Sequence, residues 1–165
     1  MGVIKVKKQH TERKLSVAEK ANYIKNNPLI LLKSISNKPE SRLTSFEKIK
    51  MVKEGVSKQA LEELKEKTGL DYDRLSAILS VARATLINKK GDTRFDTPLS
   101  ERIMSIATIY SYGYEVFEDE EKFNHWMMHP VRALGWQTPL ELMDTQYGRA
   151  EVGDLIGRIQ YGIFS

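Results

Sequence analysis

A close succession of helix start signals, which begins at Thr44, limits what this chain can fold into more than any other feature. Thr44 and Glu47 have the spacing of a capping box, in which the hydroxyl and the carboxylate each accept a backbone N–H at the helix start. Later starts are indicated by polar residues that precede apolar residues at helical spacing: Ser57, Asp71, Thr97, Asp119 and Thr138. Because no alternating run of β-branched residues occurs, the sequence predicts an all-α fold.

The bounds of the expected helices follow from these caps and from the glycines that end them. After Thr44 we expect a helix that ends at Gly55, with Phe46, Ile49 and Val52 on one face. The other helices are expected near 16–26, at 58–68, 72–79, 82–90, from 98 to about 113, at 120–128, and before Tyr161.

The formal net charge of +4 is distributed unevenly along the 165 residues. Residues 1–56 contain 13 Lys and Arg against 5 Asp and Glu, residues 57–97 contain 8 against 7, and residues 98–165 contain 5 against 10. A basic N-terminal part indicates approach to an anion such as nucleic acid, although a solvated tail has the same composition. Because the chain has no cysteine and no apolar run long enough to cross a bilayer, we expect a cytoplasmic protein.

Residues 70–90 have the spacing of a helix-turn-helix. A short helix with Ile78 and Leu79 is followed by a turn at Ser80 and by a second helix that is anchored through Leu86. Ser80 stands where glycine is usual in such a turn, which predicts a mildly strained left-handed residue.

If Leu86 points inward, the second helix exposes side chains that suit DNA. Asn88 and Thr85 are placed to meet base edges, and Ala84 to meet a thymine methyl group. Basic side chains beside them are placed to contact phosphates. The expected DNA-binding residues are Arg83, Ala84, Thr85, Asn88, Lys89 and Lys90.

A second interpretation of this unit stays open, namely a helical hairpin inside a core with solvated charges on its exterior. Ala82 begins the second helix without the Ser or Thr that normally caps it, which costs about 1 kcal/mol of helix stability. The helix-turn-helix spacing therefore does not by itself establish base-specific binding.

The last third of the chain contains five short motifs in order: Val116-Phe-x-Asp119, Trp126-x-x-x-Pro130, Ala133-Leu-Gly135, Thr138-Pro-Leu-x-Leu142 and Arg158-Ile-x-Tyr-Gly162. Together with the preceding helix-turn-helix, these motifs resemble the Xre/MbcA/ParS antitoxins over about residues 45–165. Two positions depart from the family pattern. Trp136 stands where the family usually has a second glycine after Gly135, and Val131 stands where Asn is common.

The resemblance implies a helix-turn-helix bundle at 44–97 and a C-terminal helical toxin-binding domain at 98–165, after a partly flexible extension at 1–43. Such proteins block the active site of a co-expressed toxin, commonly of the RES type, which degrades NAD or transfers ADP-ribose. They are usually homodimers, assemble with the toxin into larger complexes and repress their own operon. The acidic C-terminal part suits this role, because a cleft that binds NAD needs basic groups for the pyrophosphate.

The expected toxin-binding residues are aromatic and basic side chains of this domain: Trp136, Tyr147, Arg149, Arg158 and Tyr161. Trp126, at helical spacing from Phe123, is instead expected to pack in the core. His125 and His129 have zinc-ligand spacing but no third ligand nearby, so we expect no metal, no cofactor and no enzyme activity. The alternative function is a stand-alone helix-turn-helix transcription regulator with a C-terminal dimerisation module.

Overall fold

The computed structural model describes residues 16, 18–19, 22 and 29–162, and every regular element within them is helical. Two isolated bridges, Ser57 to Arg94 and Val131 to Gln137, are the only β pairing in that part of the chain. The expected all-α fold is therefore confirmed. The elements in chain order are η1 (Glu40–Arg42), α2 (Ser45–Glu54), α3 (Lys58–Thr68), α4 (Tyr72–Leu79), α5 (Arg83–Ile87), α6 (Thr97–Phe117), α7 (Glu120–Met127), η2 (Arg132–Leu134), η3 (Glu141–Asp144) and α8 (Gln146–Gln160).

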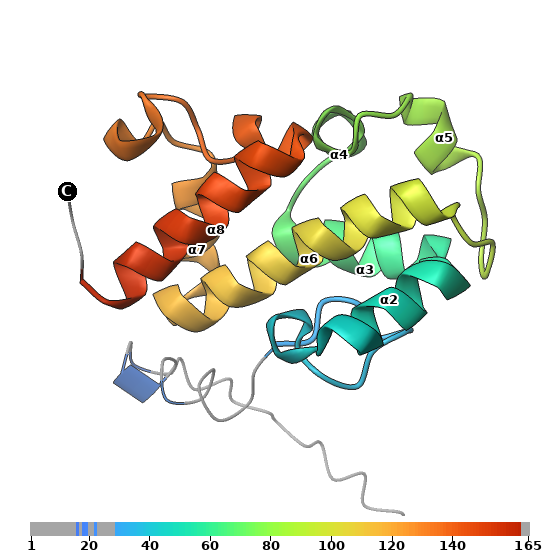
Figure 1. The fold of residues 1–165 in the computed structure, drawn as a ribbon, viewed down its shortest axis with the longest axis horizontal. Helices are drawn as coiled ribbons and strands as arrows, with labels where there is room; N and C mark the ends of the chain where they lie inside the picture. Colours follow the sequence, from blue (N-terminus) through green and yellow to red (C-terminus); the bar gives the residue numbers. More distant parts are fainter. Residues whose placement is uncertain (1–15, 17, 20–21, 23–28, 163–165) are drawn as a thin grey trace, which may run out of the picture.

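Helix α6, with 21 residues, is the central element of the fold (Figure 1). It packs against η1, α2, α3, α4, α7 and α8. Eleven of its residues are buried and they lie on several sides of the helix, as is typical of a helix inside a core. Because α6 contacts elements from both halves of the chain, it fixes the helix-turn-helix relative to the C-terminal helices.

The predicted helix caps are present. The Thr44 hydroxyl accepts the N–H of Glu47 at 3.2 Å, and the Glu47 carboxylate accepts the N–H of Thr44 at 2.8 Å. Hydrogen bonds from the Lys38 ammonium and from Thr44 lower the pKa of the Glu47 carboxyl to about 2. Three further caps accept the backbone N–H that the sequence predicted: Ser57, Asp71 and Asp119.

Helix α5 is shorter than predicted, because it ends at Ile87 and not at Lys90. A helix this short depends on tertiary packing, and residues 88–92 contain no apolar side chain that packs on the core. Only Leu86 of α5 is buried, and it holds the helix against the protein.

Helix α6 begins one residue earlier than predicted and ends later. Its N-cap is Asp96 rather than Thr97, and the Asp96 carboxylate accepts the N–H of Leu99 at 3.0 Å. The helix also continues past Gly113 to Phe117, where α7 begins to cover it.

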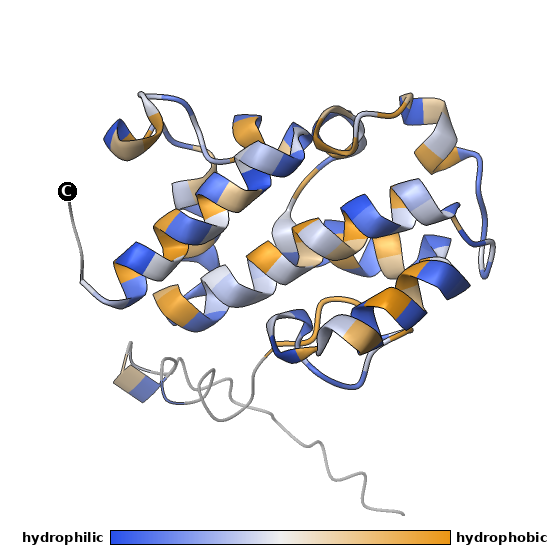
Figure 2. Ribbon diagram, in the orientation of Figure 1, coloured by the Kyte–Doolittle hydropathy of each residue, from blue (hydrophilic) through white to orange (hydrophobic). Residues whose placement is uncertain are grey.

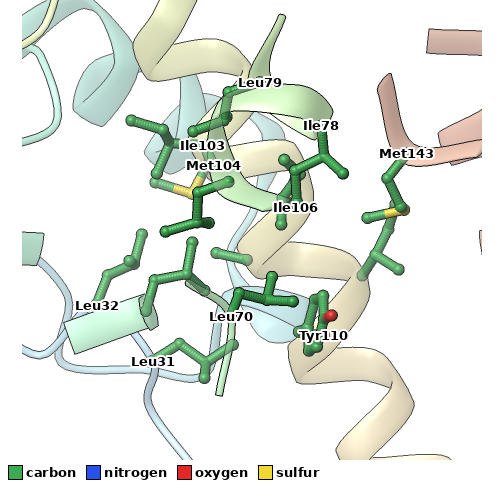
Figure 3. Close-up of a cluster of buried hydrophobic side chains, with 14 of the residues drawn as sticks. Leu31, Leu32, Leu70, Ile78, Leu79, Ile103, Met104, Ile106, Tyr110 and Met143 are labelled. Carbon is green, nitrogen blue, oxygen red and sulfur yellow. The ribbon is translucent and has the colours of Figure 1, made fainter. Parts of the chain in front are cut away.

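Residues 29–43 belong to the core, although no regular helical period marks them in the sequence. Leu31 and Leu32 are fully buried and lie with Leu70 against α6 (Figure 3). The buried Glu40 carboxylate accepts the N–H of Leu32 at 2.8 Å and that of Leu31 at 3.1 Å. Burial raises the pKa of Glu40, while these hydrogen bonds oppose the rise. Most of the helix expected near 16–26 lies outside the described residues.

A cluster of aromatic rings joins α6 to α7. Phe123 is fully buried and makes edge-to-face contacts with Tyr110 and Tyr114 at centroid distances of 5.4 and 5.5 Å. Trp126 stacks on Phe123 at 5.6 Å and is half-buried, which agrees with its expected packing role. Gly113 lies under the Phe123 ring, where a Cβ atom would overlap the ring carbons.

Gly113→Ala is expected to lower the free energy of unfolding by about 1–3 kcal/mol, because the added methyl group forces the Phe123 ring out of its packed position. Chemical denaturation of the full chain measures this change. Gly153→Ala is the matched control, since a Cβ atom there meets nothing within 4 Å. That control should stabilise α8 by about 0.5–1 kcal/mol. Equal effects of the two substitutions would contradict the packing described for α6 and α7.

Candidate functional site

The helix-turn-helix consists of α4, a turn at Ser80 and α5. Ser80 has φ 52° and ψ 47°, the left-handed conformation that the sequence predicted for this position. Leu86 has no exposed surface, so it points inward as expected. Ala82 precedes α5 without a side-chain cap. The geometry therefore matches the expected unit, except for the shorter second helix.

All six expected DNA-binding residues lie on the surface around α5. Arg83, Ala84, Thr85, Asn88 and Lys90 are exposed, and Lys89 is half-buried. Lys89 lies over the ring of Phe95 at 5.6 Å from its centroid. Arg83 forms an ion pair with Asp73 at 3.3 Å, and both side chains are more than half exposed, so solvent screens this pair. Neither contact removes the six side chains from the surface.

Lys58, a residue that sequence reasoning missed, holds the C-terminal end of α5. Its side chain is 9% exposed, and its ammonium group donates a hydrogen bond to the Leu86 carbonyl at 2.7 Å. The same ammonium contacts the Tyr72 hydroxyl and the Glu62 carboxylate. Burial disfavours the charged form, but the contacts with Glu62 and Tyr72 outweigh it, so the pKa of Lys58 is raised.

The sequence contains one signal for this contact. Lys58 and Glu62 are four residues apart on α3, which is ion-pair spacing on a helix. That spacing indicates a surface pair and does not show that α5 covers it. The hydrogen bond to Leu86 explains how an uncapped helix of five residues keeps its place.

The turn of the helix-turn-helix also contacts the C-terminal part of the chain. The Ser80 hydroxyl donates a hydrogen bond to the Asp144 carbonyl at 3.3 Å. Beside it, α4 and η3 enclose a hollow of about 420 Å³ that is lined by Arg74, Ala77 and Glu141, among others. The two units therefore meet directly at the turn as well as through α6.

The outer face of α8 carries three of the five expected toxin-binding residues. Tyr147, Arg158 and Tyr161 recur at positions i, i+11 and i+14, which lie on one side of a helix. Tyr147 is 89% exposed and Tyr161 is 77% exposed. Between them on the same face lie the exposed carboxylates Glu151 and Asp154. We call these five residues the α8 outer face.

The two arginines of the expected set make internal contacts. Arg158 pairs with Glu151 at 3.1 Å on the α8 outer face. Arg149 lies on the opposite side of α8 and donates to the Met143 carbonyl at 2.9 Å. Burial and the nearby Arg102 lower the pKa of Arg149. The structure therefore separates Arg149 from the other residues of the set.

Trp136, the fifth residue of the set, lies in the loop that follows η2. Its side chain is 68% exposed and its φ is 64°. The preceding Gly135 is also left-handed, with φ 66°, and the loop is closed by a hydrogen bond from the Trp136 N–H to the Val131 carbonyl at 3.0 Å. Residue 136 thus has the left-handed backbone conformation that favours glycine, at the position where the family pattern has glycine. The bulky tryptophan side chain makes this conformation strained.

His125 and His129 lie next to each other on α7 and just after it. The rings of His125 and His129 are stacked at a centroid distance of 3.7 Å, and the Nδ1 atom of His129 lies 2.7 Å from the His125 carbonyl. Within residues 29–162 and the few described before them, no three His, Cys, Asp or Glu side chains gather around a site for a metal ion. In the same part of the chain, every helix is too short or too polar to traverse a bilayer.

The fold and these surfaces define a two-part helical protein, in which a helix-turn-helix precedes a helical unit with exposed aromatic side chains. A sequence model described as the antitoxin Xre-like helix-turn-helix domain matches residues 47–107. A second, described as the antitoxin Xre/MbcA/ParS C-terminal toxin-binding domain, matches residues 113–162. The chain therefore belongs to the Xre/MbcA/ParS family of antitoxins.

Three curated relatives agree with this assignment. The chain is 37% identical over 76 residues to an Antitoxin Xre of Photorhabdus laumondii, and the matched residues cover 46% of this chain and 51% of that protein. It is 35% identical over 85 residues to an Antitoxin Xre of Yersinia enterocolitica, and the matched residues cover 51% of this chain and 57% of that protein. It is 25% identical over 134 residues to the Prs ADP-ribosylating antitoxin of a Sphingobium species, and the match covers 75% of this chain and 84% of that protein.

The chain thus spans about half the length of the first two relatives. The first family match ends at residue 107 and the second begins at residue 113, and both positions lie within the continuous helix α6. The expected domain boundaries after residues 43 and 97 remain predictions.

Lys58→Met is expected to speed amide hydrogen exchange in α5 and to lower stability by about 1.5–3 kcal/mol, because the Leu86 carbonyl loses a charged donor. Lys65→Met is the matched control. Lys65 also lies over the Tyr72 ring, at 5.2 Å, but sits on the turn of α3 beyond Glu62. If both variants leave exchange in α5 unchanged, Lys58 does not hold this helix.

Proposed function

We propose that this chain is an antitoxin that binds a RES-type toxin, which degrades NAD or transfers ADP-ribose, and blocks its active site. The α8 outer face and Trp136 make the contact with the toxin. The surface around α5 binds operator DNA and represses the operon that encodes both proteins. From the family resemblance we further infer a homodimer within a larger complex, acting in the cytoplasm.

The observation that carries this proposal is the strained and exposed Trp136. A bulky residue in a left-handed conformation costs free energy, and a side chain that is 68% exposed recovers little of it by packing within the chain. Strain of this kind is typical of binding sites, and tryptophan is the side chain most enriched among residues that dominate interface affinity. A pocket on a partner protein explains why the loop keeps this residue.

The charge of the α8 outer face supports the same partner. Glu151 and Asp154 are exposed between Tyr147 and Tyr161, so the face has aromatic side chains at both ends and carboxylates in the middle. A toxin cleft that binds NAD needs basic groups for the pyrophosphate, and an acidic surface complements it and speeds association. Arg158 is already paired with Glu151, which leaves Asp154 as the more available carboxylate.

One relative supports the chemistry assigned to the toxin. The name of the Sphingobium protein associates it with ADP-ribosylation of Prs, and it matches this chain over most of its length. ADP-ribosyl transfer consumes NAD, so this relative is consistent with a toxin of the proposed class. We propose no enzyme activity for the chain itself, because its conspicuous surface residues are aromatic and charged binding residues.

The second part of the proposal is DNA binding through α5. Asn88, at the end of α5, is exposed on the side opposite Leu86, and Thr85 is exposed on the flank of the helix. Both are side chains that can meet base edges, and Lys90 adds positive charge next to Asn88. The alternative, a stand-alone regulator, needs only this half of the molecule. It leaves the exposed Trp136 and the acidic α8 outer face without a role.

Trp136→Gly is expected to raise the Kd for the purified toxin by at least about 30-fold, because an aromatic interface residue is lost. The same change should stabilise the free chain by up to about 1 kcal/mol, because glycine accepts the left-handed backbone. In co-expressing cells, the variant should no longer protect NAD from the toxin. Isothermal titration, thermal unfolding and cellular NAD levels measure the three effects.

Glu118→Gly is the matched control, since the exposed Glu118 is also a non-glycine residue with a left-handed backbone, with φ 53°. It should gain similar stability and keep full affinity for the toxin. If the unaltered chain fails to protect NAD when co-expressed with the toxin, the antitoxin function is wrong and the stand-alone regulator is preferred.

Asn88→Ala is expected to weaken binding to operator DNA by about 1–3 kcal/mol and to leave binding to unrelated DNA unchanged. Lys90→Ala should instead weaken binding to both and reduce the slope of log K against log salt by about 1, because one phosphate contact is lost. Fluorescence anisotropy at several salt concentrations measures both. Lys122→Ala, on α7, is the control and should change neither.

A further inference from the structure

Lys58 contacts both ends of residues 86–93, the segment in which α5 ends and the chain turns toward α6. Lys58 is the first residue of α3, where a backbone N–H has no partner within the helix, and this N–H donates to the Thr93 carbonyl at 2.9 Å. The ammonium group of the same residue donates to the Leu86 carbonyl at 2.7 Å. One buried residue therefore holds the 86–93 segment at its start and at its end. Figure 2 shows that the connection from α5 to α6 is mostly hydrophilic.

The hydrogen bond to Leu86 replaces the one that would continue α5. In a longer helix, the Leu86 carbonyl would accept the N–H of Lys90. Here it accepts the Lys58 ammonium, as the last carbonyls of a helix can do with a basic side chain. The chain then turns, because the Lys90 carbonyl accepts the N–H and the hydroxyl of Thr93 at 3.1 and 2.7 Å. Asn88 and Lys90 therefore lie at and beyond the end of α5, in a short segment closed by hydrogen bonds.

The Lys58 ammonium has no hydrogen left for a DNA phosphate. It carries three N–H donors, and it contacts three acceptors within the chain: the Leu86 carbonyl, the Tyr72 hydroxyl and the Glu62 carboxylate. Tyr72 in turn donates its hydroxyl hydrogen to Glu62, so the two side-chain acceptors hold each other in place. An effect of Lys58 on DNA must therefore act through the residues that it positions.

Half of the expected DNA-binding residues lie inside the 86–93 segment, namely Asn88, Lys89 and Lys90. A side-chain amide that meets a base edge needs a defined distance and direction for its hydrogen bonds. The attraction between a lysine and a phosphate tolerates a displaced side chain much better and carries no sequence information. A shift of this segment should therefore affect the discrimination between sequences more than the attraction to DNA in general.

We propose that Lys58 is a positioning residue for sequence-specific DNA binding, which fixes the place of Asn88 and thereby sets the preference for the operator without touching DNA itself. This inference rests on the DNA-binding half of the proposed function and names the residue that controls its specificity. Helix α3 thereby becomes part of the recognition unit, although it lies outside the helix-turn-helix.

The first test is fluorescence anisotropy of the full chain with two duplexes of equal length, one from the region upstream of its own gene and one of shuffled sequence. Lys58→Met should raise the Kd for the upstream duplex by at least about 10-fold and change the Kd for the shuffled duplex by less than about twofold. Lys58→Arg, which keeps a charged donor, should recover most of the loss. Lys65→Met, on the same helix, is the matched control and should change neither value.

A double-mutant cycle separates positioning from a general loss of structure. Asn88→Ala should weaken binding of the unaltered chain to the upstream duplex, but it should have almost no further effect in the Lys58→Met background, where Asn88 is already displaced. Independent effects of the two substitutions would overturn the proposal. Equal weakening of both duplexes by Lys58→Met would also overturn it, because discrimination would then not depend on Lys58.

Circular dichroism shows whether each variant is folded. If Lys58→Met does not fold, the cycle is measured with Tyr72→Phe, which removes one acceptor of the ammonium and should weaken binding to the upstream duplex alone by about 3-fold. Independent effects of Tyr72→Phe and Asn88→Ala would overturn the proposal in the same way.

Failure of the proposed function has a different signature. If the unaltered chain binds the upstream and shuffled duplexes equally, the DNA-binding half of the proposed function is wrong, and this inference with it. If the unaltered chain prefers the upstream duplex and the preference survives Lys58→Met, the proposed function stands and the role of Lys58 alone is overturned.

Discussion

The burial of α6 on several sides is the constraint on which the rest of this structure depends. A helix with eleven buried residues must be covered by other elements, and these come from both ends of the described chain. Residues 29–43 cover it from one direction and α7 and α8 from others. Gly113 permits the closest of these contacts, because the Phe123 ring occupies the space of its missing side chain. The relative positions of the functional surfaces follow from this packing.

Three surfaces remain after α6 is covered, and each has a different chemical character. The exposed residues around α5 include Arg83, Asn88 and Lys90, whereas those of the α8 outer face are mainly acidic and aromatic. On α2 they are apolar beside lysines. In the proposed function, DNA and the toxin therefore contact separate surfaces and do not compete with each other. The contact between Ser80 and Asp144 places the turn of the helix-turn-helix directly next to the C-terminal unit.

The helices and their caps could be predicted because they depend on residues within one or two turns. The place of residues 29–43 could not, because it depends on the Glu40 carboxylate receiving the N–H groups of Leu31 and Leu32 across a loop. The early end of α5 and the role of Lys58 also depend on which elements meet in space. Trp136 was predicted as a toxin-binding residue by residue type, as an aromatic side chain of this domain. Arg149 was grouped with Tyr147 by residue type, although it lies about 200° from Tyr147 around the helix.

The central claim is that the α8 outer face and the Trp136 loop contact the toxin while α5 stays free. Hydrogen–deuterium exchange of the full chain, alone and in complex with the toxin, tests this claim most directly. We predict slower exchange in residues 131–137 and in α8, and unchanged exchange in residues 83–90. Slower exchange confined to residues 83–90, or no change in α8, would contradict it.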